Sequence, residues 1–439
     1  MNPLIAGLMF PALFALILAG IPIAFALTLV AVAGGVFAFG PMVFDQLYGG
    51  IYSAATNFIL SAIPMFVLMG AILERSGIAL RLYHTMQLWM GRLPGGLAVA
   101  TIAMGALFAA AAGVVGAVEI MIGLMAIPAM QRYRYDNSLI AGTICAGGSL
   151  GTMIPPSVIA VMYAALAQLS IGEVLAAMLL PGFIMVGLFI AYILLRCMIR
   201  PQDGPPAAGS ELDVPLREKL IATAASLLPT LALVFAVLGS LLAGIASPTE
   251  AAAVGAAGAT LLCIAYRRFS FGMLREALAT TVRISSMILL IVAAGTMFMS
   301  IFAANGGPRL VQEVTNSLGL GPTGLIVLFL AIVFLLGFVL DWTANVLICV
   351  PLFTPFIRAA GIDPIWFATL VIIVIQTSYL TPPMASAIFY LRSIAPPDMT
   401  YWQMCKGVVP FILVQFLTLG LVIVFPVLAT WLPGKIVGF

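Results

Sequence analysis

Two short segments place glycines, hydroxyl side chains and a proline pair inside long apolar sequence. They are residues 147–157 (GGSLGTMIPPS) and residues 376–383 (QTSYLTPP). Glycine frees the backbone and proline cannot continue a helix, so each segment predicts an interrupted membrane helix. Such a break exposes carbonyl groups that can coordinate Na+ and N–H groups that can hold an anion, although a proline kink without a ligand is the alternative. The prolines are expected to begin the second part of each helix, with Thr381 as the N-cap and Pro382 as the first helical residue of the later one.

Two acidic residues, Glu119 and Asp341, lie within apolar runs, where an ionisable side chain is costly and usually functional. Asp341 begins the sequence DWTAN and is expected at the tip of a helical hairpin, where an ion ligand or a gate would lie. A capping or helix-to-helix hydrogen bond is the alternative for both acids. Glu250, in the sequence SPTE at 247–250, is interpreted as a helix cap.

The composition indicates a membrane protein. Of the 439 residues, 63% are hydrophobic and 8% are charged, whereas a soluble domain carries about 25% charged residues. Apolar runs recur along the chain, and we predict an all-α polytopic protein with about 11 or 12 membrane segments, in which residues 1–38 span once or twice. Five scattered cysteines, one histidine and the lack of GxxxxGK[ST] and HExxH sequences lead us to expect neither an enzyme nor an ATP-driven pump, no cofactor and no nucleic-acid partner.

Basic residues mark the segments that are expected to face the cytoplasm. Arg and Lys gather in four segments that we interpret as inside loops, 74–94, 129–138, 196–219 and 267–283. They are absent from three segments that we interpret as outside loops, 39–50, 164–175 and 243–250. Because 74–94 and 129–138 would lie on the same side, residues 95–128 are predicted to enter the membrane and return as a re-entrant helical hairpin. The Pro- and Gly-rich residues 200–220 are interpreted as a cytoplasmic linker.

The two halves of the chain repeat each other at an offset of 227 residues. At this offset Asp136 corresponds to Asp363, and the proline pair at 155–156 corresponds to the pair at 382–383. Each unit is a hairpin followed by a broken helix, and the alternation of loops gives the two units opposite orientations, as in the inverted repeats that form substrate and ion sites near the bilayer midplane. The predicted division is N-terminal scaffold helices (1–94), a first repeat (95–199, with hairpin 95–128 and broken helix about 137–168), the linker (200–220), central scaffold helices (221–321), and a second repeat with a C-terminal helix (322–439, with hairpin 322–355 and broken helix 364–390).

The order and spacing of several short sequences resemble one family along nearly the whole chain. This family is the large membrane subunit, the DctM-like component, of tripartite ATP-independent periplasmic (TRAP) transporters. The matching sequences are AIPMF at 62–66, LPGGL at 93–97, the hairpin tip at Gly113, IPPS at 154–157, PG at 181–182, SPTEAA at 247–252 and LTPP at 380–383.

The resemblance implies a Na+-driven, elevator-type importer in the bacterial inner membrane, whose hairpins and broken helices carry the substrate past a static scaffold. Its partners would be a small four-span membrane subunit and a periplasmic solute-binding protein. The residues implied to bind substrate or ions are Gly113, Gly116, Gly148, Gly151, Thr152, Pro155, Pro156 and Ser157 in the first unit, and Gly337, Asp341, Thr343, Asn345, Thr377, Ser378, Thr381 and Pro382 in the second. Na+ would be coordinated by backbone carbonyls near Gly113, Gly151, Asp341 and Thr377.

Two further features bear on the ion sites and the substrate. Gly113 is followed by Val114 where many family members have serine, which removes a hydroxyl ligand and leaves the carbonyls. Residues 376–397 resemble a branch labelled mannitol/chloroaromatic, some of whose members handle 2-oxo acids or lactate, so a small carboxylate is expected as the substrate.

The rival hypothesis is a stand-alone Na+- or H+-coupled carboxylate carrier that needs no binding protein. A channel would have no need for two broken helices.

Overall fold

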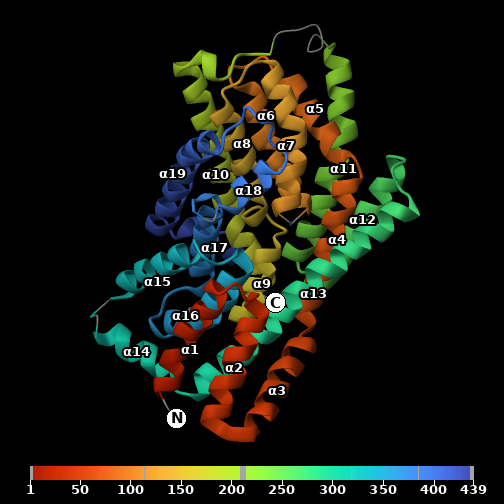
Figure 1. The fold of residues 1–439 in the computed structure, drawn as a ribbon. Helices are drawn as coiled ribbons and strands as arrows, with labels where there is room; N and C mark the ends of the chain where they lie inside the picture. Colours follow the sequence, from red (N-terminus) through yellow and green to blue (C-terminus); the bar gives the residue numbers. More distant parts are fainter. Residues whose placement is uncertain are drawn as a thin grey trace.

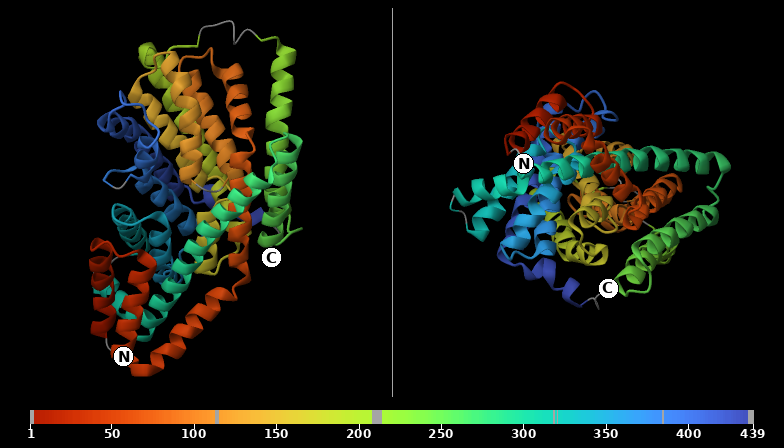
Figure 2. Two further views of the ribbon diagram at one scale, coloured as in Figure 1. Left: turned by 45° about the vertical axis from the view of Figure 1, so that its right-hand side comes forward. Right: turned by 90° about the horizontal axis from the view of Figure 1, so that it is seen from below.

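The computed structural model describes residues 3–112, 115–207, 214–317, 319, 321–383 and 385–435, and all regular secondary structure in these residues is helical. The molecule is elongated, with α6–α8 and α10 toward one end and α1–α3 with α14 toward the other (Figures 1 and 2). The α-helices are α1 (Pro3–Leu18), α2 (Ile23–Phe39), α3 (Val43–Ala55), α4 (Ala62–Arg75), α5 (Ile78–Met90), α6 (Gly96–Ala112), α7 (Val115–Arg132), α8 (Asn137–Ser149), α9 (Val158–Ala167), α10 (Ile171–Ile199), α11 (Leu216–Leu242), α12 (Pro248–Ala265), α13 (Phe271–Ala304), α14 (Gly307–Ser317), α15 (Pro322–Leu336), α16 (Trp342–Ala359), α17 (Pro364–Leu380), α18 (Ser386–Arg392), α19 (Tyr401–Val424) and α20 (Val427–Thr430). Short 3-10 helices are η1 (Gly40–Met42), η2 (Phe58–Ser61), η3 (Leu150–Thr152), η4 (Pro201–Asp203) and η6 (Pro433–Lys435).

The helices confirm an all-α polytopic membrane protein. Within the described residues, seven helices are long and apolar enough to cross a bilayer, and the bent pair α4–α5 makes eight if it forms one span. Shorter apolar helices occupy parts of the predicted hairpins and broken helices, among them α9, α15 and α17. At 1.5 Å per residue these helices of 10–17 residues are about 15 to 26 Å long, less than about 30 Å of hydrocarbon. The predicted number of 11 or 12 membrane segments can be reached only if these shorter helices are included. That number stays a prediction.

The N-terminal apolar run forms two helices. The chain turns after α1 at Gly20, whose positive φ of +87° favours glycine, and α2 begins directly after Pro22. Helices α1 and α2 pack against each other, and the long helix α13 packs against α2, α3 and α4. In Figure 1, α13 runs obliquely across the molecule past these helices. This arrangement places the first turn of α2 next to the middle of α13.

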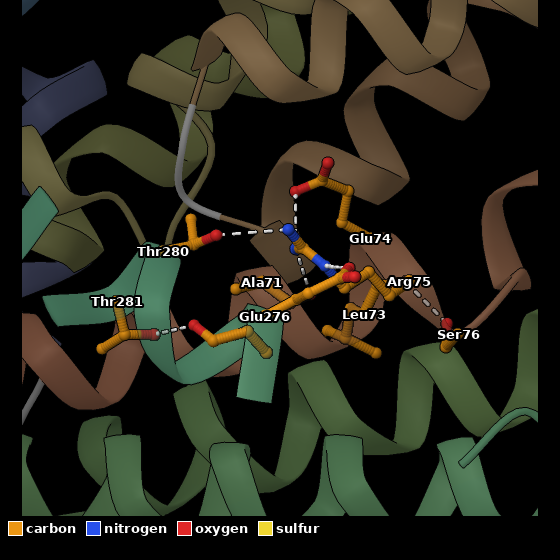
Figure 3. A network of polar contacts seen from close by, with 9 residues as sticks. Ala71, Leu73, Glu74, Arg75, Ser76, Glu276, Thr280 and Thr281 are labelled. Atoms are coloured by element: carbon orange, nitrogen blue, oxygen red, sulfur yellow. Dashed lines mark hydrogen bonds and ion pairs between the residues drawn. The ribbon is translucent and has the colours of Figure 1, made fainter. Parts of the chain in front are cut away.

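Residues 74–94 do not form the loop that the charge pattern suggested, because most of them belong to helix α5. Helices α4 and α5 meet at a bend of 63° at Gly77, which has a φ of +73°. Arg75 ties this bend to α13: Nη2 donates to Thr280 Oγ1 at 3.2 Å, and the guanidinium pairs with Glu74 at 3.5 Å and Glu276 at 3.6 Å (Figure 3). Arg75 therefore forms its contacts with other residues of the protein, at the end of helix α4. Its charge indicates a helix end and not a loop.

The two units that the 227-residue offset relates are built alike. Asp136 caps α8 by accepting from Leu139 N at 3.0 Å, and the corresponding Asp363 caps α17 by accepting from Ile365 N at 2.8 Å. The units also exchange contacts, because α7 of the first packs against α18 of the second and α16 of the second packs against α9 of the first. Such reciprocal packing is what a two-fold relation between repeats produces. The inverted orientation of the repeats and the division into domains stay predictions.

Both breaks differ from the expectation that proline starts the second part of each helix. After α8 and η3 the chain passes through Pro155 and Pro156, joined by a cis peptide bond, and α9 starts only at Val158. The second pair, Pro382 and Pro383, is also joined in cis, and α18 starts at Ser386. The physical reason is that a residue before proline is forced out of the helical region, so the first proline of a pair cannot be helical.

Thr381 is likewise not an N-cap. It lies at the C-cap of α17 in an extended conformation (φ −88°, ψ 125°), as expected for a residue before proline. Its Oγ1 donates back to the carbonyl of Thr377 at 2.7 Å. The hydroxyl therefore belongs to the end of α17. By contrast, the interpretation of Glu250 is confirmed, since Ser247 and Glu250 form a reciprocal capping box at the start of α12.

Candidate functional site

A cavity of about 890 Å³ lies where elements from both repeats meet the helices α2 and α13. Its walls come from the first turn of α2, the start of α7, the middle of α13, the start of α16, the end of α17 and α18. The fifteen described lining residues are Pro22, Ile23, Ala24, Phe25, Gly116, Ile120, Ile284, Ser286, Met287, Leu290, Ile291, Asp341, Trp342, Tyr379 and Tyr390. Most of the wall is apolar with a few convergent polar groups, which is the usual composition of a small-molecule site.

Asp341 is the only acid among these lining residues, and none of the fifteen is Lys, Arg or His. It is the N-cap of α16, where its carboxylate accepts from Thr343 N at 3.3 Å and from Thr343 Oγ1 at 2.9 Å. Thr343 is thus a partner of the acid rather than a separate group in the cavity wall. The alternative considered for Asp341, a helix cap, is therefore true, and the same carboxylate also faces the cavity.

Glu119 lies behind the cavity wall. Its side chain is fully buried, and Oε2 accepts a hydrogen bond from the Tyr379 hydroxyl at 3.1 Å. Gly148 of α8 leaves the necessary room, because a Cβ at that position would lie 2.7 Å from Glu119 Cβ. Tyr379 therefore connects the cavity to a buried acid on α7, and through it the first hairpin to the second broken helix.

Glycines at the two hairpin tips permit close packing on the second broken helix. A Cβ on Gly116 would lie 2.7 Å from Cζ of Tyr390, and a Cβ on Gly337 would overlap the hydroxyl of Ser378. Gly116 also lines the cavity, whereas Gly337 does not. Both glycines thus bring a hairpin against the segment around the second break.

The predicted hydroxyl residues of the breaks are engaged locally. Each one donates to a backbone carbonyl in its own segment, and its oxygen lone pairs stay available for a cation or another donor. The bonds are Thr152 to Ser149 O, Ser157 to Thr152 O, Thr377 to Ile373 O and Ser378 to Ile375 O, all at 2.8 Å.

Asn345 holds the second hairpin together. Its amide donates to the carbonyl of Val333 in α15 at 2.8 Å, and its Oδ1 accepts from Cys349 Sγ at 3.2 Å. The side chain is fully buried, so these bonds lie away from water. An ion could use Asn345 only after one of them is broken.

The structure brings together only part of the predicted site. Gly116 and Asp341 share the cavity, while Gly148, Gly151, Thr152, Pro155, Pro156 and Ser157 are buried around the first break and do not line it. Thr377, Ser378, Thr381 and Pro382 flank Tyr379 in sequence without lining the cavity themselves. Gly113 lies outside the described residues.

Several lining residues were not predicted. Tyr379 lies inside the segment 376–383, but its aromatic ring was not considered. Tyr390, Trp342 and Ser286 carried no sequence signal that separates them from other residues of apolar helices. Pro22 did carry a signal, since it interrupts the first apolar run, and the turn that follows it forms one wall.

The donors near Asp341 suit a hard monovalent cation. The described residues contain no group of three or more His, Cys, Asp or Glu side chains that could hold a metal ion. Four of the described lining residues carry side-chain oxygen atoms, Ser286, Asp341, Tyr379 and Tyr390, and oxygen is the ligand type that Na+ prefers. These oxygen atoms are ligands of the kind that would suit Na+.

Comparison with known proteins gives consistent matches along the chain. Residues 10–428 match the family model described as Tripartite ATP-independent periplasmic transporter, DctM component. The C4-dicarboxylate TRAP transporter large permease protein DctM of Pseudomonas aeruginosa is 28% identical over 385 residues, which are 88% of each chain. The ectoine TRAP transporter large permease protein TeaC of Halomonas elongata is 29% identical over 431 residues, covering 97% of this chain and 98% of that one. The crystal structure of the Alcanivorax borkumensis YdaH transporter shares the fold, with a TM-score of 0.63 at 17% identity over 90% of this chain and 89% of the other.

Proposed function

Since the chain belongs to the DctM family, the large permease subunits of TRAP transporters, we propose that it imports a small organic anion across the bacterial inner membrane by Na+ symport. Membership makes it a transporter subunit and not an enzyme. Its proposed partners are a small four-span membrane subunit and a periplasmic solute-binding protein. The proposed substrate is a small carboxylate, a 2-oxo acid or lactate.

The observation that carries this proposal is the charge of the cavity. Asp341 is its only described acid, and no described lining residue is cationic. A carboxylate that entered this cavity alone would be repelled by Asp341 and would find no basic side chain. A cation bound beside Asp341 removes this repulsion, so Na+ has to bind before the substrate. The carboxylate can then meet N–H groups at the freed helix ends.

The same geometry supports a proposal for how the substrate moves. One side of the cavity is formed by α7, α16, α17 and α18, and the other side by α2 and α13. We propose that the first set, with the hairpins and broken helices, shifts across the membrane along the second set. The Na+ gradient drives this shift, and the membrane potential adds about 2.3 kcal/mol for each net charge per 100 mV.

The proposed substrate class rests on residues 376–397, which resemble the branch labelled mannitol/chloroaromatic, some of whose members handle 2-oxo acids or lactate. The relatives bear the names of different substrates, C4-dicarboxylate and ectoine. Selectivity in such systems belongs largely to the separate binding protein. The name of a relative and the label of the branch are therefore both weak guides to the substrate.

Uptake into proteoliposomes tests the proposal. The chain is reconstituted with its small subunit, a Na+ or K+ gradient is imposed, and labelled pyruvate is supplied with or without the binding protein. We expect uptake only when Na+ and the binding protein are both present. Na+-dependent uptake by this chain alone would identify a stand-alone carrier, and equal uptake with K+ would reject Na+ coupling.

A further inference from the structure

A second hollow lies at the far end of α10, away from the cavity described above. It has a volume of about 530 Å³ and lies between α8, α10 and α19. Its polar lining includes Arg196, Arg200 and Lys406. The basic residues at this end of α10 predict that it faces the cytoplasm.

Helix α8 packs closely on α19 beside this hollow. A Cβ on Gly142 would overlap the carbonyl of Gly407, and a Cβ on Gly407 would overlap the carbonyl of Ser138. The two backbones are therefore in contact beside Lys406, while the end of α10 stands opposite. In Figure 1 the ends of α8, α10 and α19 lie together in the same part of the molecule.

The three basic side chains differ in how they are balanced. Arg196 donates to Asp136 Oδ1 at 2.9 Å and to Asp203 Oδ2 at 2.8 Å, so its charge is compensated. Arg200 and Lys406 are exposed, and neither side chain has a hydrogen bond or an ion pair to any residue that the structure describes. Arg196 with its two carboxylates carries a net charge of −1, so with Arg200 and Lys406 the charged groups at the hollow sum to +1.

The surface next to the hollow is apolar. On α10, Met198 is 72% exposed and Ile199 is 70% exposed, and on α19 Leu413 is 63% exposed. Trp402, at the first turn of α19, is 76% exposed, as is typical of an aromatic side chain at the headgroup level of a bilayer. Acyl chains can lie along these helices while a headgroup enters the hollow.

We propose that this hollow binds the phosphate of an anionic phospholipid through Arg200 and Lys406. Basic pockets between membrane helices on the cytoplasmic side suit such headgroups, and each basic residue near an anionic headgroup gives about a fivefold gain in affinity. The bound phosphate, a diester with one negative charge, joins α10 to α19 and balances the net charge of +1. A soluble phosphate ion would satisfy the same two cations without using the apolar surface, so the apolar side chains favour the lipid.

The test is native mass spectrometry of the purified full chain with its small subunit, titrated with phosphatidylglycerol or with phosphatidylcholine. The decisive variant is Arg200→Gln with Lys406→Gln. The matched control is Arg217→Gln with Lys219→Gln, which removes two positive charges at the start of α11, outside the hollow. A second variant, Arg200→Lys with Lys406→Arg, keeps both charges and shows whether the side chains act through charge.

We expect the wild type to prefer phosphatidylglycerol over phosphatidylcholine, and the decisive variant to bind phosphatidylglycerol about 25-fold more weakly, because two fivefold contributions are lost. The control and the charge-retaining variant should bind as the wild type does. Equal binding of the two lipids, or wild-type binding by the decisive variant, would overturn the proposal. Displacement of the lipid by an equal concentration of inorganic phosphate would also overturn it, since the site would then be one for a soluble anion.

Discussion

The charge of Asp341 can be removed without removing the helix cap that it forms. In the substitution Asp341→Asn, the amide oxygen can still accept from the backbone N–H and hydroxyl of Thr343, the two donors that Asp341 now serves. Asparagine is as good an N-cap as aspartate. Asp341→Ala would lose the cap as well, at a cost of about 1 kcal/mol, and would mix stability with transport. The asparagine variant therefore isolates the charge.

The expected size of the effect follows from Coulomb's law. A cation 4 Å from a carboxylate gains about 4 kcal/mol at an effective dielectric constant of 20. Asp341 is only partly buried and faces an open cavity, so water screens the pair and we take about half of this value, about 2 kcal/mol. This energy corresponds to about a 30-fold rise in the Na+ concentration needed for half-maximal uptake.

The assay is uptake into proteoliposomes at a series of Na+ concentrations, with the thermal unfolding midpoint measured in parallel. Glu313→Gln is the matched control, because Glu313 is 63% exposed on α14 and pairs only with Arg309 among the residues described. We expect the control to match the wild type in both measurements, and Asp341→Asn to differ in Na+ dependence alone. A half-maximal Na+ concentration within twofold of the wild type would refute the argument that Asp341 attracts the coupling ion.

Three other substitutions test the packing behind the cavity. Gly148→Ala forces a methyl group against Glu119, so we expect overpacking to lower the stability by about 1–3 kcal/mol and to lower the thermal unfolding midpoint. The control is Gly187→Ala on an open face of α10, which should leave the midpoint unchanged. Equal midpoints of the two variants would contradict the contact between Gly148 and Glu119. Tyr379→Phe removes the hydroxyl that donates to Glu119 and should cost about 1–3 kcal/mol while slowing uptake; a variant unchanged in both would show that the bond is dispensable. Asn345→Ala breaks the link between α15 and α16 and should speed hydrogen exchange in α16; unchanged exchange would mean that apolar packing alone holds the hairpin.

The architecture was predictable where single residues have strong local consequences. Asp136 and Asp363 each precede an apolar helix, and each caps it, because a short acceptor side chain satisfies free N–H groups there. The two proline pairs predicted two breaks for an equally local reason, the loss of the helical hydrogen bond. The residue at which each helix restarts depends on the backbone conformation that a residue before proline adopts. This restriction predicts a later start of the helix than the preference of proline for the first helical turn would predict.

The cavity was only partly predictable because it depends on tertiary packing. Gly116 and Asp341 belong to hairpin tips that sequence marks with glycines and an acid. The opposite wall comes from α2 and α13, which lie outside both predicted repeats. Tyr390 looks like any aromatic residue of an apolar helix until its ring is found against Gly116. The periodicity of apolar residues in the sequence indicates which face of a helix is buried. It does not indicate which other helix packs against that face.

Ser149 and Gln376 occupy corresponding positions at the 227-residue offset, and they are in contact, since Gln376 Nε2 donates to Ser149 Oγ at 3.1 Å. When two units are related by an axis, corresponding residues can touch only next to that axis. Helices α8 and α17 therefore meet there, each just before its break, and Gln415 of α19 joins them at 3.5 Å from the same hydroxyl. All three side chains are fully buried, so sliding one broken helix along the other would leave polar groups unpaired, at about 1–3 kcal/mol each. The apolar contacts of the cavity wall with α2 and α13 carry no such cost, because one apolar surface can replace another. The two broken helices should consequently move as one body, and the surface along which they move should be the one that contains the cavity.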